Sequence, residues 1–219
     1  MRDALLRPIG YGLLVKINVE GVENVPTTGP TLVVINHIAA IDPFVVVGLI
    51  HSRFVVPMSK IENFNHPLVS LIARSWGVFP VRRGEPDREA LASSLALMEQ
   101  DYPVLMAPEG TRRPALHEAK DGMTYLAARS NAMIVPVGVD GTEGFPGTLK
   151  RLRRTPVQVR FGRPFRLRTG GQRRIPRDDL HRMTTQAMYQ MAALLPPHRR
   201  GFYADLDQAE TDLLEFVTP

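Results

Sequence analysis

Residues 31–44 read Thr-Leu-Val-Val-Ile-Asn-His-Ile-Ala-Ala-Ile-Asp-Pro-Phe and carry the clearest structural signal in the chain. The apolar run Thr31–Ile35 predicts a strand that is buried on both faces. A short turn with His37 follows it, and Pro43 directly after Asp42 predicts the start of a helix. A buried strand that leads through a polar turn into a helix is typical of α/β proteins, which bind ligands beyond the carboxyl ends of their strands.

Strand-like and helix-like segments alternate along the rest of the chain. The other predicted strands are 54–57, 77–81, 104–107, 134–139 and 157–161. The predicted helices have apolar residues at helical spacing and cover 43–50, 67–75, 87–100, 120–130 and 177–195. One more short helix is predicted at 205–217, within a C-terminal extension, 196–219. We therefore expect a single α/β domain over residues 1–219, with a mostly parallel or mixed central sheet flanked by helices.

Length and composition fit one such domain and exclude several classes of protein. The 219 residues fall short of the roughly 250–300 at which chains divide into domains. Hydrophobic residues make up 44% and charged residues 22%, as in globular proteins. The absence of cysteine excludes disulfides, thiolate metal sites and a cysteine nucleophile. No apolar run approaches the roughly 18 residues of a membrane-spanning helix.

The N-terminal segment 1–25 has two interpretations. Its leucines and isoleucine are flanked by Arg2, Arg7 and Lys16, as in segments that lie in a membrane interface. A proline and two glycines weaken a helix there, so packing in the core is the alternative.

Positive charge is concentrated in one part of the chain. The net charge is +5, yet segment 150–182 holds Lys150 and eleven arginines against Asp178 and Asp179. This predicts one basic face for an anionic partner such as phospholipid headgroups or an acidic protein, with a solvated surface as the alternative. No aromatic residues are interleaved through 166–182 to stack on bases, so nucleic acid is not expected as a partner.

His37 and Asp42 are the candidate catalytic pair. An imidazole suits general-base chemistry near neutral pH, and a carboxylate on its second nitrogen fixes the tautomer. As an alternative role, Asp42 would cap the helix that Pro43 begins. The sequence has no Gly-x-Ser-x-Gly elbow, and its histidines lack the spacing of metal ligands. A base without its own nucleophile points to transfer of a group onto a substrate hydroxyl.

A second polar turn, residues 109–112, follows the predicted strand 104–107. Its glycine allows close approach of the backbone to a ligand, its threonine offers a hydroxyl, and its arginine can bind a phosphate in bidentate fashion. The alternative is a surface turn with a Glu–Arg pair. Segment 77–83 repeats this design, with Arg82 and Arg83 at the end of a strand.

These blocks together resemble the glycerolipid acyltransferases typified by 1-acylglycerol-3-phosphate acyltransferase. Asn36–Asp42 is similar to the family's His-x-x-x-x-Asp block, and Gly77–Arg83 is similar to the second block. Pro108–Arg112 matches the third block, and Ile134–Gly138 resembles the fourth. The blocks span residues 31–140, half of the chain. Two departures stand out: an arginine precedes the second-block arginine, and Arg-Pro-Ala follows the third block in place of the usual glycine.

The resemblance implies a glycerol-3-phosphate acyltransferase-like fold and O-acyl transfer to 1-acylglycerol-3-phosphate, which makes phosphatidic acid. The acyl donor would be a thioester of coenzyme A or of acyl carrier protein, and no cofactor or metal is implied. His37 would be the general base and Asp42 would orient it. Another lysophospholipid, a lyso-ornithine lipid or a glycolipid is an alternative acceptor. The remote alternative function is that of a protein that binds lipid or nucleic acid without catalysing a reaction.

The resemblance also assigns the binding residues. The acceptor site would comprise Arg83, Glu109, Gly110, Thr111 and Arg112. Pro136 of the fourth block is associated with the acyl donor, and a rigid turn there after a buried strand is expected to shape an acyl groove; its alternative role is to end that strand. We expect peripheral attachment to the cytoplasmic face of the membrane, through the N-terminal segment and the basic segment 150–182.

Overall fold

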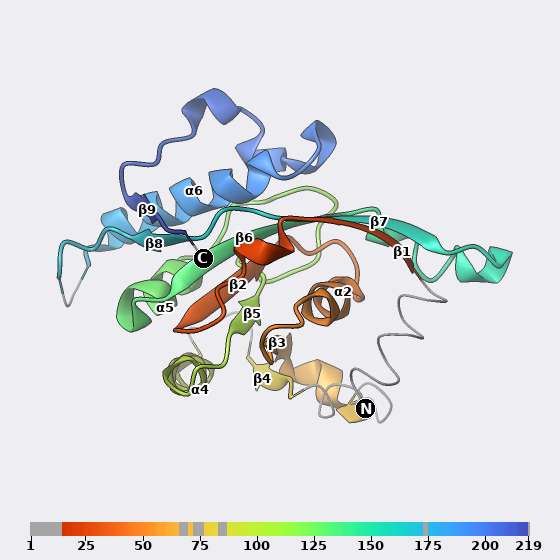
Figure 1. Cartoon of the computed structure of the whole chain (residues 1–219), viewed down its shortest axis with the longest axis horizontal. Coiled ribbons are helices and arrows are strands. Elements are labelled where there is room, and N and C mark those ends of the chain that lie inside the picture. Colours follow the sequence, from red (N-terminus) through yellow and green to blue (C-terminus); the bar gives the residue numbers. More distant parts are fainter. Residues whose placement is uncertain (1–14, 66–69, 72–76, 83–86, 173–174, 219) are drawn as a thin grey trace.

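The computed structural model of the chain describes residues 15–65, 70–71, 77–82, 87–172 and 175–218. Nine strands in this part of the chain form one mixed sheet in the order β1-β7-β6-β2-β5-β3-β4, and β8 and β9 continue from β6 (Figure 1). The strands are β1 (Val15–Glu20), β2 (Thr31–Ile35), β3 (Val56–Lys60), β4 (Phe79–Val81), β5 (Val104–Met106), β6 (Met133–Asp140), β7 (Thr155–Phe161), β8 (Phe165–Leu167) and β9 (Leu214–Phe216).

Strand directions place the functional loops at one edge of the sheet. Strands β6, β2, β5, β3 and β4 run parallel, so their carboxyl ends share that edge. Strand β7 is antiparallel to β6, and β1 is parallel to β7. The amino ends of β1 and β7 therefore lie at the same edge as the carboxyl ends of the other five strands.

Helices cover both faces of the sheet. They are α2 (Asp42–Leu49), α4 (Arg88–Glu99), α5 (Gly122–Ser130) and α6 (Arg177–Ala193). Alternate residues of β2 point to opposite faces: Val33 and Ile35 pack with α2, whereas Leu32 and Val34 pack with α4, α5 and α6. Figure 1 shows α2 and α6 on opposite sides of the sheet. The burial of all five β2 residues follows from this three-layer arrangement, and the predicted α/β fold class is confirmed.

Short 3-10 helices complete the described structure: η3 (Val22–Asn24), η4 (Ile61–Asn65), η5 (Thr142–Gly144), η6 (Leu149–Arg151), η7 (Pro197–Arg199), η8 (Gly201–Tyr203) and η9 (Leu206–Gln208). No helix in the described ranges combines the length and the apolar character needed to cross a bilayer. Residues 1–14, which hold most of the predicted interface segment, lie outside those ranges.

The predicted strands and four of the five predicted helices are present, and their ends differ from the predicted ends by at most three residues. Most of the fifth, 67–75, lies outside the described residues. The predicted helix at 205–217 is wrong. Asp205 accepts a hydrogen bond from the Asp207 N–H and starts only the single turn of η9, after which Leu214–Phe216 pairs with β8. Pairing with a free sheet edge outweighs a weak helical pattern.

Candidate active site

The turn between β2 and α2 brings the predicted catalytic pair together. His37 Nδ1 lies 2.9 Å from Asp42 Oδ2, and the two side chains are 12% and 0% exposed. No described residue hydrogen-bonds the other ring nitrogen, Nε2. The pair therefore leaves one imidazole nitrogen available to a substrate proton, in a partly water-excluded position.

Asp42 organises the turn as well as the imidazole. Its Oδ2 accepts the N–H groups of Ile38 at 2.6 Å and Ala39 at 2.8 Å. The alternative role as an N-cap is wrong, because Ile41 is the N-cap and Asp42 is the first residue within α2. Its Oδ1 is buried without a hydrogen-bond partner among the described residues. Three polar contacts on one oxygen hold this carboxylate in place.

Asn36 anchors the turn to the neighbouring strand. Its Nδ2 donates to the Val139 carbonyl at 2.9 Å, and its Oδ1 accepts the Val139 N–H at 2.7 Å. This buried amide thus completes a two-bond bridge between the end of β2 and the end of β6. No sequence pattern predicted this role, and Asn36 stood out only by its position beside His37.

The loop after β5 is tied to the same turn. The Arg113 N–H donates to the His37 carbonyl at 2.8 Å. Glu109 is 7% exposed, and its Oε1 accepts the His117 N–H at 2.7 Å. Burial raises the pKa of Glu109 to about 7, although backbone hydrogen bonds from His117 and His37 and the charge of Arg113 oppose the rise. Glu109 therefore faces inward and braces the loop against His37.

The next three residues of this loop face outward. Gly110 has a φ of +69°, which favours glycine, and an added Cβ there would meet no atom within 4 Å. Thr111 and Arg112 are exposed, and neither forms an ion pair or a side-chain hydrogen bond with a described residue. The structure thus places an open backbone, a hydroxyl and a guanidinium next to the turn that carries His37.

The second block is described only in part. Arg83 lies outside the described residues. Arg82 is exposed and ion-pairs with Glu89 of α4 at 3.3 Å, and its N–H donates to Asp87.

The expected turn at Pro136 is wrong. Pro136 lies inside β6, opposite Val34 of β2. Its carbonyl accepts the Gly162 N–H at 2.8 Å, at the point where the partner of β6 changes from β7 to β8. The missing N–H of proline is tolerated there because the ladder is already interrupted. The alternative role as a strand terminator is also wrong, since β6 continues to Asp140.

The C-terminal extension also supports the site, a role that no sequence pattern predicted. Arg199 is 7% exposed, donates to the Pro114 carbonyl at 2.8 Å and pairs with Asp140 at 2.6 Å and with Glu143. Its backbone carbonyl accepts the Leu116 N–H. Burial lowers the pKa of Arg199, but the two carboxylates outweigh this effect and raise it. Arg199 therefore links the end of β6 to the loop after β5.

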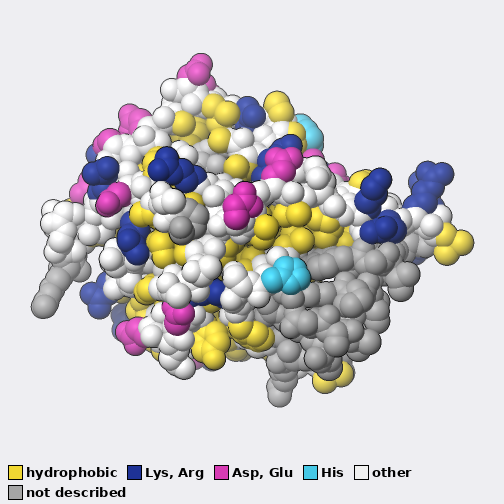
Figure 2. All heavy atoms as spheres, viewed as in Figure 1, with side chains coloured by type: hydrophobic (Ala, Val, Ile, Leu, Met, Phe, Trp, Pro, Cys, Tyr) yellow, Lys and Arg dark blue, Asp and Glu magenta, His cyan; other side chains and the backbone are white. Residues whose placement is uncertain are grey.

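The basic segment is not gathered into one face. Arg160 pairs with Glu20, Arg168 donates to the Leu214 carbonyl, and Arg182 pairs with two carboxylates of the C-terminal extension. Cations of the loop before β7 lie together at one end of the molecule in Figure 2. Strand and helix geometry places Arg160 in β7, Arg166 in β8 and Arg182 in α6.

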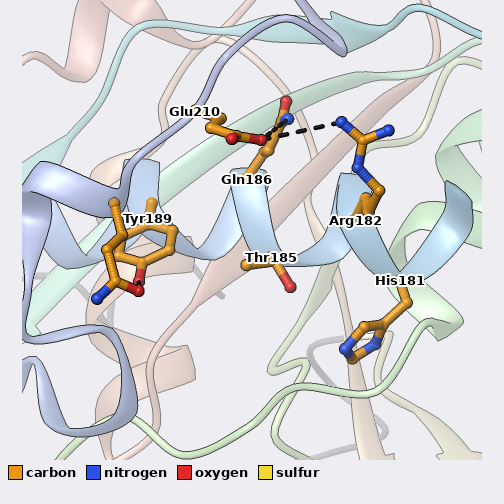
Figure 3. A pocket seen from close by; sticks show the side chains of 7 residues that line it. His181, Arg182, Thr185, Gln186, Tyr189 and Glu210 are labelled. Carbon is orange, nitrogen blue, oxygen red and sulfur yellow. Dashed lines mark hydrogen bonds and ion pairs between the residues drawn. The ribbon is translucent and has the colours of Figure 1, made fainter. Parts of the chain in front are cut away.

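Two hollows lie away from His37. One, of about 110 Å³, is on the outer side of α6, where Arg182 and Gln186 contact Glu210 (Figure 3). The other, of about 610 Å³, is lined mainly by apolar side chains, among them Phe54 and Tyr102, at the amino ends of β3 and β5. That is the edge opposite the catalytic pair. Among the described residues, no three His, Asp or Glu side chains come close enough to hold a metal ion.

Comparison with known proteins identifies the family. Residues 16–140, more than half of the chain, match the family model described as Acyltransferase. The chain belongs to the acyltransferase family. It is 32% identical over 133 residues to the chloroplastic 1-acyl-sn-glycerol-3-phosphate acyltransferase of Arabidopsis thaliana, and 29% identical over 135 residues to the 1-acyl-sn-glycerol-3-phosphate acyltransferase of Borreliella burgdorferi.

These matches cover 58% and 60% of this acyltransferase-family chain, but only 36% and 54% of those two relatives. Among solved structures, the 1-acyl-sn-glycerophosphate acyltransferase PlsC of Thermotoga maritima superposes with a TM-score of 0.64 at 21% identity. That alignment covers 86% of this chain and 76% of PlsC. The two chains therefore share a fold.

Proposed function

We propose that this protein transfers an acyl group from an acyl thioester to the free hydroxyl of 1-acylglycerol-3-phosphate, making phosphatidic acid. The observation that carries the proposal is the His37–Asp42 pair at 2.9 Å, at the strand edge where the exposed Thr111 and Arg112 also lie. The matched relatives named as 1-acyl-sn-glycerol-3-phosphate acyltransferases support the choice of acceptor.

The chemistry needs only one base. Asp42 holds Nδ1, so His37 Nε2 removes the proton of the acceptor hydroxyl as its oxygen attacks the thioester carbonyl. The carbonyl π electrons move to oxygen, and they return as the carbon–sulfur bond breaks. The thiolate leaves and takes the proton from the imidazolium, so the enzyme ends in its starting state. Asp42 stabilises the imidazolium between these steps.

The acceptor phosphate is assigned to the outward part of the loop after β5. The Arg112 guanidinium can bind phosphate oxygens in bidentate fashion, and the Thr111 hydroxyl and the open backbone at Gly110 add donors. Arg83 is proposed as the second arginine of this site. Glu109, which faces inward, contributes by positioning the loop beside His37.

The donor is proposed to be an acyl thioester of coenzyme A or of acyl carrier protein, and no cofactor is required. Pro136, buried within β6, would contribute to the wall of the donor site. Because the acceptor is a lipid, we propose that the protein works at the cytoplasmic face of the membrane and binds anionic lipid. The N-terminal segment 1–25 and cations of the segment 150–182 would make this contact.

Thioester consumption by the purified protein, with and without 1-acylglycerol-3-phosphate, tests the function. His37→Ala should reduce acceptor-dependent turnover by about 100-fold to 10,000-fold. His181→Ala is a matched control, because His181 of α6 lies 3.4 Å from Asp121, the N-cap of α5, and so forms an imidazole–carboxylate pair away from the site. Equal activity of the His37 variant and the control would remove His37 from the mechanism.

The alternative acceptor class rests on the second block, which departs from the family's pattern at Arg82, an exposed residue that ion-pairs with Glu89. An acceptor without a phosphate monoester, such as a lyso-ornithine lipid or another lysophospholipid, should be assayed in parallel. If His37-dependent turnover is faster with such an acceptor, that lipid and not 1-acylglycerol-3-phosphate is the acceptor, and the proposed acyl-transfer chemistry is unchanged.

A further inference from the structure

The loop before β7 forms a projecting tip at the edge of the sheet that carries His37. The pairing of β6 with β7 ends at Asp140 opposite Gln158, so the first three residues of β7 extend beyond β6 and pair with β1. The tip, residues 149–154, sits at the end of this two-stranded ribbon, at the far right of Figure 1. It therefore projects from the edge at which we propose the lipid acceptor enters.

The tip exposes one apolar side chain in an unusual backbone conformation. Leu152 is 97% exposed, and its φ of +51° is rare for a bulky residue. The turn is closed below it, because the N–H groups of Arg151 and Arg153 both donate to the Thr148 carbonyl at 3.0 Å. At the base, the Arg154 guanidinium donates to the Val15 carbonyl at 2.8 and 3.0 Å. The hydrogen bonds of the turn thus hold Leu152 in an exposed position.

Cations surround this leucine. Lys150, Arg151 and Arg153 are exposed, and none of them ion-pairs with a described residue. Figure 2 shows Lys and Arg side chains gathered at this end of the molecule, with an apolar side chain next to them. The other arginines of segment 150–182 described above are engaged with carboxylates or carbonyls, so the tip is where unpaired positive charge and an exposed apolar group coincide.

We propose that the tip docks on an anionic phospholipid bilayer: Leu152 enters the interface, and Lys150, Arg151 and Arg153 bind lipid phosphates. A bilayer accommodates a single inserted side chain, whereas a stable protein partner needs about 800 Å² on each side. Each cation near an anionic surface should strengthen binding by about fivefold. This inference rests on the proposed function, since it orients the His37 edge towards the lipid that the reaction consumes.

A dye at the tip tests the insertion directly. The chain has no cysteine, so Leu152→Cys gives it a single labelling site for an environment-sensitive dye. Phe202→Cys is the matched control, because Phe202 is also well exposed but lies in η8 of the C-terminal extension. Phosphatidylcholine vesicles that contain phosphatidylglycerol should shift the emission to the blue at position 152 only, and pure phosphatidylcholine should have little effect. Equal shifts at both positions, or no shift at 152, would overturn the proposal.

Charge removal provides the second measurement. The triple variant Lys150→Ala/Arg151→Ala/Arg153→Ala should bind phosphatidylglycerol vesicles up to about 100-fold more weakly at low salt, and by less at high salt. A triple alanine control at three exposed helix cations, Arg88, Arg129 and Arg177, has the same change in charge and should bind almost as wild type. Equal weakening in both variants would show a response to net charge and overturn the assignment to the tip. A dye response to an acidic acyl carrier protein, with none to vesicles, would identify a protein partner instead.

Turnover separates this inference from the proposed function. With short-chain donor and acceptor dissolved as monomers, the tip variant should keep wild-type activity, because no hydrogen bond or ion pair between described residues links the tip to His37. A loss there would mean damage to the site and would contradict a purely docking role. If even the wild type shows no turnover, the proposed function fails, and the vesicle measurements still decide the role of the tip.

Discussion

At the scale of single residues, the site depends on side chains that hold backbone as much as on those that face substrate. Asp42 Oδ2 contacts one imidazole and two backbone N–H groups, and Glu109 braces the neighbouring loop from within. Both are acidic residues that the sequence motifs place in the site. We therefore expect substitution by the corresponding amide to affect turnover at Asp42 and the pH dependence of stability at Glu109.

Asp42→Asn should fold and yet lose turnover. The amide oxygen can still accept the N–H groups of Ile38 and Ala39, but it carries no charge to stabilise the imidazolium of His37. We expect a loss of about 100-fold to 10,000-fold in kcat, within the range for general-base catalysis. Single-turnover kinetics and a thermal unfolding midpoint check this, and wild-type kcat in the variant would show that the carboxylate charge is dispensable.

Glu109→Gln should change how stability depends on pH. The pKa of Glu109 is raised from 4.5 to about 7 in the folded protein, chiefly by burial, so the folded state binds the proton more tightly than the unfolded state. This carboxyl therefore costs stability increasingly as pH rises from 4.5 to about 7, and the cost is complete above that range. The advantage of the glutamine variant in urea unfolding should grow across this window. An advantage that shrinks with rising pH would mean that charge interactions, not burial, dominate at Glu109.

At the scale of elements, sequence patterns predicted the strands and helices that depend on local residue patterns. They missed the elements that depend on pairing with distant parts of the chain. The apolar run Thr31–Ile35 predicted β2 to the residue, since no polar side chain interrupts it. Val15–Glu20 alternates apolar and polar residues, a strand signal that the interface interpretation of segment 1–25 overlooked. The helix predicted at 205–217 became an edge strand, because β8 offered a partner. In the site, motif spacing predicted the His37–Asp42 pair, but no local pattern shows that Arg199 reaches Pro114.

The first turn of α4 offers a prediction at this scale. The Asp87 carboxylate accepts the N–H groups of Ala90 at 3.1 Å and Arg82 at 2.6 Å, and these hydrogen bonds lower its pKa. Asp87→Ala should reduce the free energy of unfolding by about 1 kcal/mol, whereas Asp87→Asn should lose less, since asparagine also caps helices. The stability from the wild-type carboxylate is present above its unfolded pKa and is lost as pH falls through the lower folded value. Chemical denaturation at neutral and acidic pH measures this, and equal losses in both variants would exclude a capping role.

At the scale of the whole molecule, two buried arginines form hydrogen bonds at opposite edges of one sheet. Arg53 lies at the amino ends of the strands, where it donates to Gly29, Thr31 and Asp101 and is 8% exposed. Arg199 lies at the carboxyl ends, beside the catalytic turn. Both side chains are almost fully buried and hydrogen-bonded, but Arg53 pairs with one carboxylate and Arg199 with two, and the two arginines lie at opposite edges of the sheet.

Replacing each by methionine should therefore separate stability from catalysis. Both variants lose hydrogen bonds from a buried charged donor, and one such bond typically contributes about 1.5–3 kcal/mol to the unfolding free energy. Arg199→Met should also release Pro114 and the loop that carries Arg112, and a displacement of about 1 Å there can cost as much as 100-fold in kcat/KM for the acceptor. Arg53→Met should leave that ratio unchanged when both proteins are assayed well below their unfolding temperatures. Arg199→Lys should restore part of the lost activity, because lysine keeps one charged donor for Asp140. Equal effects of the two methionine variants on kcat/KM would mean that Arg199 stabilises the fold without positioning the site.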